Sequence, residues 1–106
     1  MTRQITSENF QNLVLDGVQP ALIDFWAPWC GPCRMVGPSV DRLAELYEGK
    51  AVIGKVNVDD ETSIAQRYRV MSIPTLMVFK GGKAVETVVG ARSFEDLEAI
   101  LKKHLG

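Results

Sequence analysis

The sequence predicts an α/β fold, a three-layer α/β/α sandwich built around a mixed central β-sheet. Short apolar segments of strand length alternate with segments in which apolar residues recur at helical spacing. The chain then closes with a predicted hairpin and a final helix, without a further alternation. Alternating strands and helices followed by a hairpin imply a mixed sheet that is covered on both faces.

The chain begins with a strand, a helix and a second strand. A short strand is expected near residues 3–5. Thr6 or Ser7 is a suitable N-cap for a short helix through Leu15, because its hydroxyl oxygen can accept a hydrogen bond from an unpaired N–H of the first turn. Residues 21–27, ALIDFWA, are a short apolar run of the kind that forms a strand buried on both faces.

The middle of the chain contains a long helix, a strand and a short helix. The long helix follows the two cysteines and extends to about Gly49. Pro38 lies inside this helix and should bend it, because proline donates no hydrogen bond and its ring clashes with the preceding turn. Residues 51–58 form the next buried strand, and the acidic residues 59–61 open a short helix at the positive end of its dipole. The apolar stripe of the long helix consists of Val36, Val40, Leu43, Ala44 and Tyr47.

The last part of the chain is a β-hairpin and a helix. Residues 75–80 and 83–89 are two strand segments joined by a Gly-Gly turn. Ser93 caps the final helix, and the lysines near its end suit the negative end of the helix dipole. His104 in the last turn is interpreted as a solvated residue. The apolar side of this helix consists of Phe94, Leu97, Ile100, Leu101 and Leu105.

The composition is that of a single domain over residues 1–106, with 46% hydrophobic residues for one core. The 12 basic and 13 acidic residues form no runs and give a net charge of −1, which argues against nucleic acid or a membrane as a partner. No apolar stretch approaches the roughly 18 residues of a transmembrane helix. Because the N-terminus lacks the apolar segment of a secretory signal, we expect a cytoplasmic protein. As a separate expectation, the protein is a monomer.

The only two cysteines, Cys30 and Cys33, lie in the segment WCGPC at residues 29–33. A closed zinc site needs four ligands, whereas the chain offers these two thiols and one histidine, so no metal site is predicted. A disulfide across so short a loop stabilises a protein by only about 2 kcal/mol in the chain-entropy model, against ~3 kcal/mol for a ~15-residue loop. A structural staple is therefore the weakest use of the pair.

A redox role for the two cysteines has a physical mechanism. Cys30 follows a predicted strand and precedes a predicted helix, so its sulfur would face the unpaired N–H groups at the positive end of the helix, which favour a nucleophilic thiolate. Cys33, one turn later, would lie close enough to attack the mixed disulfide and release the reduced target. Pro32 suits the first turn, where a missing N–H costs nothing, and Gly31 lets another chain approach closely.

Several motifs together resemble those of the thioredoxin family. WAPWCGPC at residues 26–33, SIPT at 72–75, FKGG at 79–82 and VGA at 89–91 match the family pattern in order and at the right separations. The resemblance covers essentially the whole chain. The combination of WCGPC with a later Ile-Pro-Thr is highly specific for this family.

The resemblance implies the thioredoxin fold and a dithiol–disulfide oxidoreductase that reduces protein disulfides, carries electrons and maintains cell redox homeostasis. It implies that Cys30 is the attacking thiol and Cys33 the resolving one. No cofactor would be bound, because the Cys30–Cys33 disulfide is itself the redox centre and thioredoxin reductase recharges it from NADPH. The pair between the cysteines, Gly31 and Pro32, contains no histidine and so favours a reductant.

Asp24 interrupts an apolar strand segment and shares a face with Leu22 and Trp26. A buried carboxylate without a partner is costly, so one interpretation is an edge strand with Asp24 in water. The other is a desolvated acid of raised pKa that takes the proton from Cys33 as it attacks. The resemblance favours the second, because it places an aspartate beneath the disulfide. It also makes Lys55 a neighbour of Asp24, against the alternative of a solvated lysine at a strand end.

Pro74 in the SIPT segment precedes a strand, and base rates alone favour an ordinary trans proline there. The resemblance implies a cis-proline that lies against the cysteines and presents the backbone of Ile73 for strand-like pairing with a substrate. We assign Trp26 mainly to packing and to shielding the site. The apolar rim that would bind substrates consists of Trp29, Pro32, Ile73, Gly90 and Ala91.

A second hypothesis belongs to another functional class. The chain could be a binding module with the thioredoxin fold, whose cysteines are incidental to a role in an assembly. The intact Cys-Gly-Pro-Cys motif, Asp24 and Pro74 argue against it, because a scaffold needs none of the three. The expected partners are therefore a reductase and disulfide-containing protein substrates.

Overall fold

The strands form one mixed sheet in the order β1-β3-β2-β4-β5. The computed structural model describes all 106 residues. β1 (Arg3–Gln4) and β2 (Ala21–Trp26) lie parallel to β3 (Val52–Asn57), one on each side of it. β4 (Thr75–Lys80) pairs antiparallel with β2, and β5 (Lys83–Val89) pairs antiparallel with β4. The predicted mixed sheet with its terminal hairpin is confirmed.

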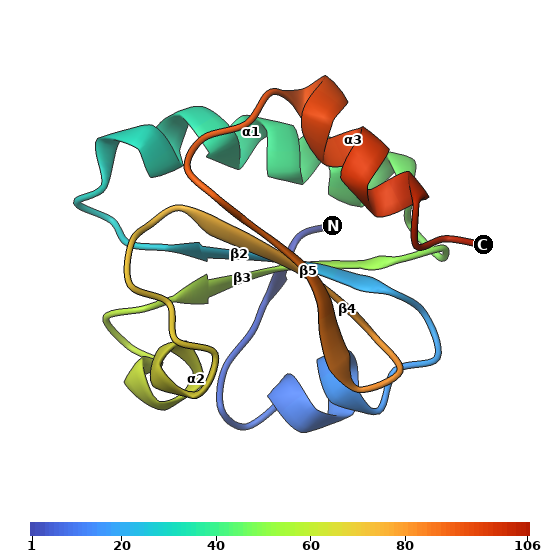
Figure 1. Cartoon of the computed structure of the whole chain (residues 1–106), viewed down its shortest axis with the longest axis horizontal. Helices are drawn as coiled ribbons and strands as arrows, with labels where there is room; N and C mark the ends of the chain where they lie inside the picture. The colour runs from blue at the N-terminus through green and yellow to red at the C-terminus, as the bar shows by residue number, and fades with distance from the viewer.

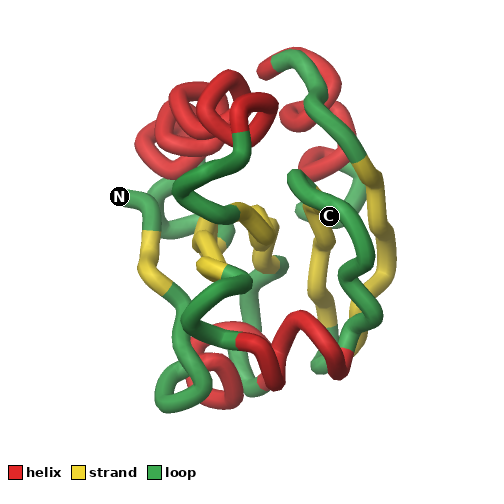
Figure 2. The backbone as a smooth tube through the Cα atoms, turned by 90° about the vertical axis from the view of Figure 1, so that its left-hand side faces the viewer, coloured by secondary structure: helices red, strands yellow, loops and turns green.

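Helices cover both faces of this sheet (Figure 1). α1 (Gly31–Leu46) and α3 (Phe94–Lys102) lie on one side, and η1 (Gln11–Leu15) and α2 (Thr62–Arg67) lie on the other. Seen from the side, the strands form a single layer between two layers of helix (Figure 2). The three-layer sandwich is therefore confirmed. None of the helices combines the length and the apolar character that crossing a bilayer requires.

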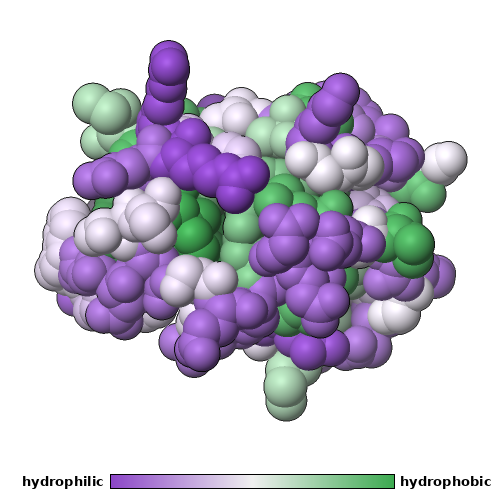
Figure 3. All heavy atoms as spheres, turned by 90° about the horizontal axis from the view of Figure 1, so that it is seen from below, coloured by the Kyte–Doolittle hydropathy of each residue, from purple (hydrophilic) through white to green (hydrophobic).

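Alternation along the central strands fills a separate core on each face of the sheet. Leu22 on β2 and Leu76 on β4 pack with the apolar stripe of α1 and with α3. Their sequence neighbours Ile23 and Met77 point to the other face and pack beneath η1 and α2. Because successive side chains of a strand point to opposite faces, a continuous apolar run serves both cores. The outer surface on the η1 and α2 side is mostly hydrophilic (Figure 3).

The first helical segment is shorter than predicted. The expected helix began after Thr6 or Ser7, whereas the structure has turns there and a π-helix, η1, over the second part of the segment. The Thr6 hydroxyl accepts from the Glu8 N–H at 3.3 Å, and the Asn9 side chain accepts from the Thr6 N–H at 2.8 Å. These are the reciprocal contacts of a helix N-cap, so Thr6 caps this segment as predicted, and the first backbone bond of helical spacing runs from the Phe10 N–H to the Thr6 carbonyl at 2.9 Å.

The long helix also ends before its predicted boundary. α1 has its C-cap at Tyr47, where the prediction extended to about Gly49. Gly49 adopts a φ of +81°, a conformation that glycine tolerates and that cannot continue a right-handed helix. Pro38 lies inside α1, and the helix continues on both sides of it.

The acidic residues 59–61 do not open a helix as predicted. α2 begins at Thr62, and the acidic residues form the turn that precedes it. Glu61 occupies the N-cap position without a capping bond from its side chain. Its carboxylate instead accepts a hydrogen bond from the Ser7 N–H at 2.8 Å. A tertiary contact with the loop after β1 therefore takes the place of the expected local one.

The end of α3 differs from its sequence-based interpretation. His104 is not a solvated residue: its Nε2 lies 2.9 Å from Oε1 of Glu86 on β5, and its side chain is 21% exposed. The Lys103 ammonium lies 2.8 Å from the other oxygen of the same carboxylate. Hydrogen bonds from Lys103 and then from His104 lower the pKa of Glu86. These contacts tie the last turns of the chain to the edge strand.

Ser93 caps α3 as predicted, because its Oγ accepts a hydrogen bond from the Asp96 N–H at 3.1 Å. Ser93→Ala should lower the free energy of unfolding by about 1 kcal/mol, since the first turn of α3 would lose a partner for one N–H. Urea denaturation of the disulfide form measures this change. Ser63→Ala, a change at an exposed serine of α2 whose side chain makes no hydrogen bond, is the matched control and should stay within about 0.5 kcal/mol of wild type.

Candidate functional site

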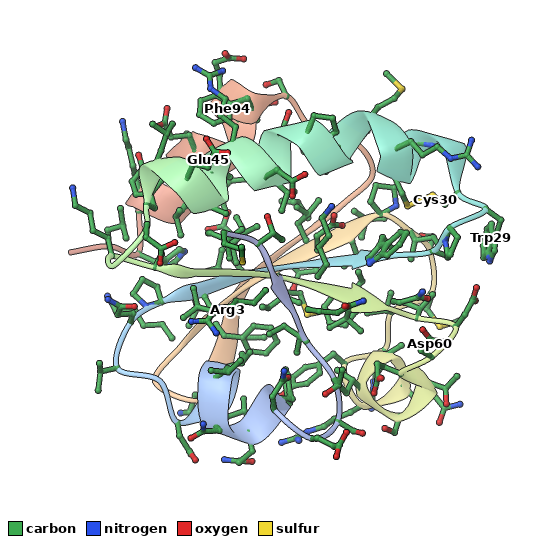
Figure 4. The ribbon with its side chains drawn as sticks, turned by 180° about the vertical axis from the view of Figure 1, so that it is seen from behind. Arg3, Trp29, Cys30, Glu45, Asp60 and Phe94 are labelled. Atoms are coloured by element: carbon green, nitrogen blue, oxygen red, sulfur yellow. A yellow bond between two sulfur atoms is a disulfide. The ribbon has the colours of Figure 1, made fainter.

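The two cysteines lie where β2 leads into α1 (Figure 4). Cys30 is the N-cap residue of α1, and Cys33 lies in its first turn. They are joined by a disulfide with 5.3 Å between their Cα atoms. Both are buried, at 5% and 4% exposure. Cys30 Sγ accepts a hydrogen bond from the Cys33 N–H at 3.3 Å, so this sulfur faces the free N–H groups of the helix end.

Local sequence explains this placement of the cysteines. Pro32 occupies the first turn of α1, where its fixed φ suits a helix and its missing N–H has no partner to lose. Gly31 and Pro32 are both exposed, and a Cβ added at Gly31 would meet nothing within 4 Å. The backbone beside the buried disulfide is therefore open on its outer side.

Asp24 is buried at the centre of the sheet. Its strand, β2, lies between β3 and β4, which rules out the alternative of an edge strand in water. The side chain is 1% exposed, and its Oδ1 has no hydrogen-bond partner. Burial raises the pKa of this carboxyl to about 7, the nearby charge of Lys55 lowers the pKa and that of Asp41 raises it. A carboxyl with a pKa near neutrality can accept and return a proton at physiological pH.

Asp24 lies on the α1 side of the sheet, between the main core and the cysteines. Leu22, two residues before it, packs in the core beneath α1 and α3. Trp26, two residues after it, is half-buried and packs against the cluster formed by Ala27 and the two cysteines. Since residues two apart on a strand share a face, the carboxyl of Asp24 points toward the layer that carries the disulfide.

Lys55 is the direct neighbour of Asp24, as predicted, but its ion pair is with another residue. The two residues stand opposite each other in the parallel pairing of β2 and β3. The Lys55 ammonium, however, lies 3.6 Å from Oδ1 of Asp41 on α1 and within 4.0 Å of no oxygen of Asp24. Its side chain is 25% exposed, so it is not the freely solvated lysine of the alternative interpretation.

The segment before β4 comes close to the disulfide. The Ile73–Pro74 peptide bond is cis, as the resemblance implies. The carbonyl oxygen of Ile73 lies 3.8 Å from Cys30 Sγ, and the Gly90 N–H donates to the carbonyl of Pro74 at 2.8 Å. Three segments far apart in sequence therefore meet at the cysteines.

An apolar pocket of about 350 Å³ lies beside the cysteines. Trp29 at its border is 67% exposed, which excludes a core role, and its indole N–H donates to Asp59 at 3.0 Å. Met71 is 92% exposed. Gly90 and Ala91 do not line this pocket. The lining consists of Trp29, Val58, Val70, Met71, Ser72 and Ile73.

Sequence reasoning missed two polar partners of the site and part of its apolar lining. Asp41 holds Lys55, and Asp59 holds the indole of Trp29. The sequence contains a weak indication that Asp41 belongs to the site. Asp41 follows Cys33 by eight residues, about two helical turns, and so lies on the same face of α1. The sequence contains no such indication for Asp59, because its contact with Trp29 joins two loops that are distant in sequence. No group of three or more His, Cys, Asp and Glu side chains is placed to hold a metal ion.

Comparison with known proteins gives one consistent family. The thioredoxin family model matches residues 1–103. A thioredoxin 1 of Nostoc sp. is 54% identical over 102 residues, which are 96% of this chain and 95% of that protein. A thioredoxin of Synechocystis sp. is 50% identical over 104 residues, 98% of this chain and 97% of that protein. A thioredoxin of Staphylococcus aureus is 52% identical over 102 residues, 96% of each chain.

Proposed function

The chain belongs to the thioredoxin family and is a protein-disulfide reductase, and we propose that Cys30, Cys33 and Asp24 carry out its dithiol–disulfide exchange. The observation that supports these roles is the position of a buried disulfide at the N-terminus of α1, with a buried, unpaired carboxyl on the strand that leads into it. A scaffold has no use for this arrangement, because an unpaired buried carboxyl costs stability.

The proposed reaction has two exchange steps. In the reduced protein, the Cys30 thiolate attacks one sulfur of a target disulfide; a mixed disulfide forms, and the second target sulfur leaves as a thiolate. Cys33 then attacks Cys30 Sγ, which forms the Cys30–Cys33 disulfide and releases the first target sulfur. The target disulfide gains two electrons, and the Cys30–Cys33 dithiol of this protein loses two. Cys30 is the first nucleophile because its sulfur faces the N–H groups of α1.

Asp24 is proposed to accept the proton that Cys33 loses in the second step. A thiol must be deprotonated to attack, and the departing target sulfur takes up a proton. A carboxyl with a pKa of about 7 is partly ionised at neutral pH and is basic enough to remove a proton from a thiol. Trp26 shields this region from water by packing against the cysteine cluster.

Substrates are proposed to bind at the exposed surface around the disulfide. The backbone of Ile73, next to Cys30 Sγ, can pair with an extended segment of the target as an added strand. Trp29 and the apolar pocket beside it offer contact area without demanding a particular side chain. Gly31, Pro32, Gly90 and Ala91 complete this surface in the proposal.

The oxidised protein is proposed to be recharged by a thioredoxin reductase that draws electrons from NADPH, so that the protein acts as an electron carrier between the two. A reductase of protein disulfides fits a reducing compartment, which supports a cytoplasmic location. We further propose that it acts as a monomer formed by one domain over residues 1–106.

Reduction of insulin, followed by turbidity with a dithiol reductant, tests the proposed function. The wild-type protein should accelerate precipitation of the reduced insulin chains well above the rate of the reductant alone. If no acceleration is seen at any concentration of the protein, the binding-module hypothesis replaces this one.

Asp24→Asn should slow target reduction near neutral pH, because asparagine cannot accept the proton from Cys33. The loss should be about 10-fold or more, since positioned general acid–base groups typically contribute ~10²–10⁴-fold. Single-turnover reduction of a fluorescent disulfide substrate at pH 7 measures it, and circular dichroism checks that the fold is intact. A rate equal to that of wild type would remove Asp24 from the mechanism.

A further inference from the structure

Three residues of α1 form a line along the face that covers Asp24. Cys33, Gly37 and Asp41 follow one another at intervals of four residues, which places them on one side of the helix. The Lys55 side chain extends from β3 beneath this line. A Cβ at Gly37 would lie 3.5 Å from Lys55 Nζ, an ordinary van der Waals contact, so the ammonium lies directly against this part of the helix on its way to Asp41.

The Lys55 ammonium has two carboxylates within its reach and is bound to one of them. Asp24 is its neighbour in strand register, yet the ion pair is with Asp41 at 3.6 Å. Asp41 is held in turn by the Thr2 hydroxyl, which donates to the same Oδ1 at 2.6 Å. Asp24 keeps an oxygen without any partner.

We propose that Asp41 is a positioning residue for the exchange reaction: its carboxylate holds the Lys55 ammonium at the surface of the protein and prevents it from pairing with Asp24. This inference rests on the proposed role of Asp24 as proton acceptor. A carboxylate that is paired with an ammonium is a weak base, so an Asp24–Lys55 ion pair would make the proton transfer from Cys33 less favourable.

The charges around Asp24 support this division of roles. β4 places Leu76 opposite it, so no charge comes from that side. β3 contributes Lys55 and α1 contributes Asp41, and Arg3 of β1 lines the same pocket as these two residues. Of these, Lys55 and Asp41 change the pKa of Asp24, in opposite directions.

A polar pocket of about 250 Å³ gives the ammonium its place at the surface. Trp26 and Lys55, which flank Asp24 within the sheet, both line this pocket together with Asp41. The Asp41 side chain is 57% exposed, whereas Asp24 is almost fully buried. Because the Lys55–Asp41 pair is partly exposed to solvent, holding the charge here avoids the desolvation that a buried pair with Asp24 would require.

Asp41→Asn tests the proposal through the titration of Asp24, which carbon NMR of its carboxyl follows in the disulfide form. This measurement does not depend on activity, so it separates the present inference from the proposed function. In Asp41→Asn the pKa of Asp24 should fall by about one pH unit, because Lys55 is released and one negative charge is lost. The pH profile of target reduction should shift in the same direction.

Three further variants make the result specific. Glu45→Gln removes the same charge one turn along α1, from an exposed side chain that makes no ion pair, and should shift the titration by less than about 0.3 pH unit. Asp41→Glu keeps the carboxylate and should restore the wild-type titration. In a Lys55→Met background, Asp41→Asn should change the pKa of Asp24 by less than half of the change seen with Lys55 present. Only the direct repulsion between the carboxylates of Asp41 and Asp24 is then removed.

Two results would overturn the proposal. If Asp41→Asn titrates like Glu45→Gln, Asp41 has no special influence on Asp24. If its full shift persists in the Lys55→Met background, Asp41 acts by repulsion alone and does not hold Lys55. A change in thermal stability alone, without a shift in the titration, would reduce Asp41 to a structural contact with Thr2 and would likewise contradict it.

Discussion

The Cys30→Ser protein is expected to reduce no protein disulfide above the rate of the reductant alone. Cys30 Sγ faces the N–H groups that begin α1 and lies next to the Ile73 carbonyl, where a target is proposed to bind. A serine hydroxyl at this position is not ionised at neutral pH and cannot form a disulfide with the target. The insulin assay should therefore show a loss of activity to background.

Cys33→Ser should give a different result from Cys30→Ser, although it also prevents turnover. The first exchange needs only Cys30, so a mixed disulfide with the target should form and then persist, because no second thiol attacks it. Non-reducing electrophoresis and mass spectrometry would detect this adduct at one target per protein. If the adduct instead formed with Cys30→Ser and not with Cys33→Ser, the two roles would be reversed.

Asp24→Asn should remove most of the dependence of stability on pH between about 4 and about 7. In wild type the pKa of Asp24 is raised from 3.8 to about 7 by burial. Between these values the folded state keeps the proton and the unfolded state does not, so stability falls as pH rises. The difference of about three pH units corresponds to roughly 4 kcal/mol, lost progressively up to pH 7. The Asp24→Asn protein, which has an uncharged side chain at this position, should not show that loss of stability.

Urea denaturation of the disulfide form at several pH values between 4 and 8 measures this effect. The slope of the unfolding free energy against pH should be clearly smaller in Asp24→Asn than in wild type. Asp60→Asn is the control, because it removes an exposed carboxyl and should keep the wild-type slope. Parallel curves for wild type and Asp24→Asn would mean that Asp24 is ionised in the folded protein at low pH, contrary to the raised pKa.

The order of helices and strands could be read from the sequence because it depends on short-range patterns. The apolar run of β2, the helical stripe of α1 and the Gly-Gly turn before β5 each reflect the geometry of one element. Predictions failed where a longer-range contact intervened, as at Glu61, whose carboxylate binds the Ser7 backbone at 2.8 Å and not the helix that follows it. In the first helical segment Thr6 makes the capping contact that was predicted, but residues 7–9 form turns and the regular helix is the short η1.

The chemical motif was also evident from the sequence. The spacing of Cys30 and Cys33 and their place between a strand and a helix depend only on neighbouring residues, and the structure contains that arrangement. Whether Asp24 was buried could not be decided from its neighbours, because an aspartate in an apolar strand fits both an edge in water and a desolvated site. The sheet order decided it, since β2 has a strand on each side.

By itself, then, the sequence determined the elements, their order and the pair of thiols. The tertiary structure decided which carboxylate holds Lys55, where the Trp29 indole donates and how close Ile73 comes to Cys30. The physical reason is range: helical and strand periodicity act over a few residues, whereas the partner of a side chain depends on which distant elements pack together.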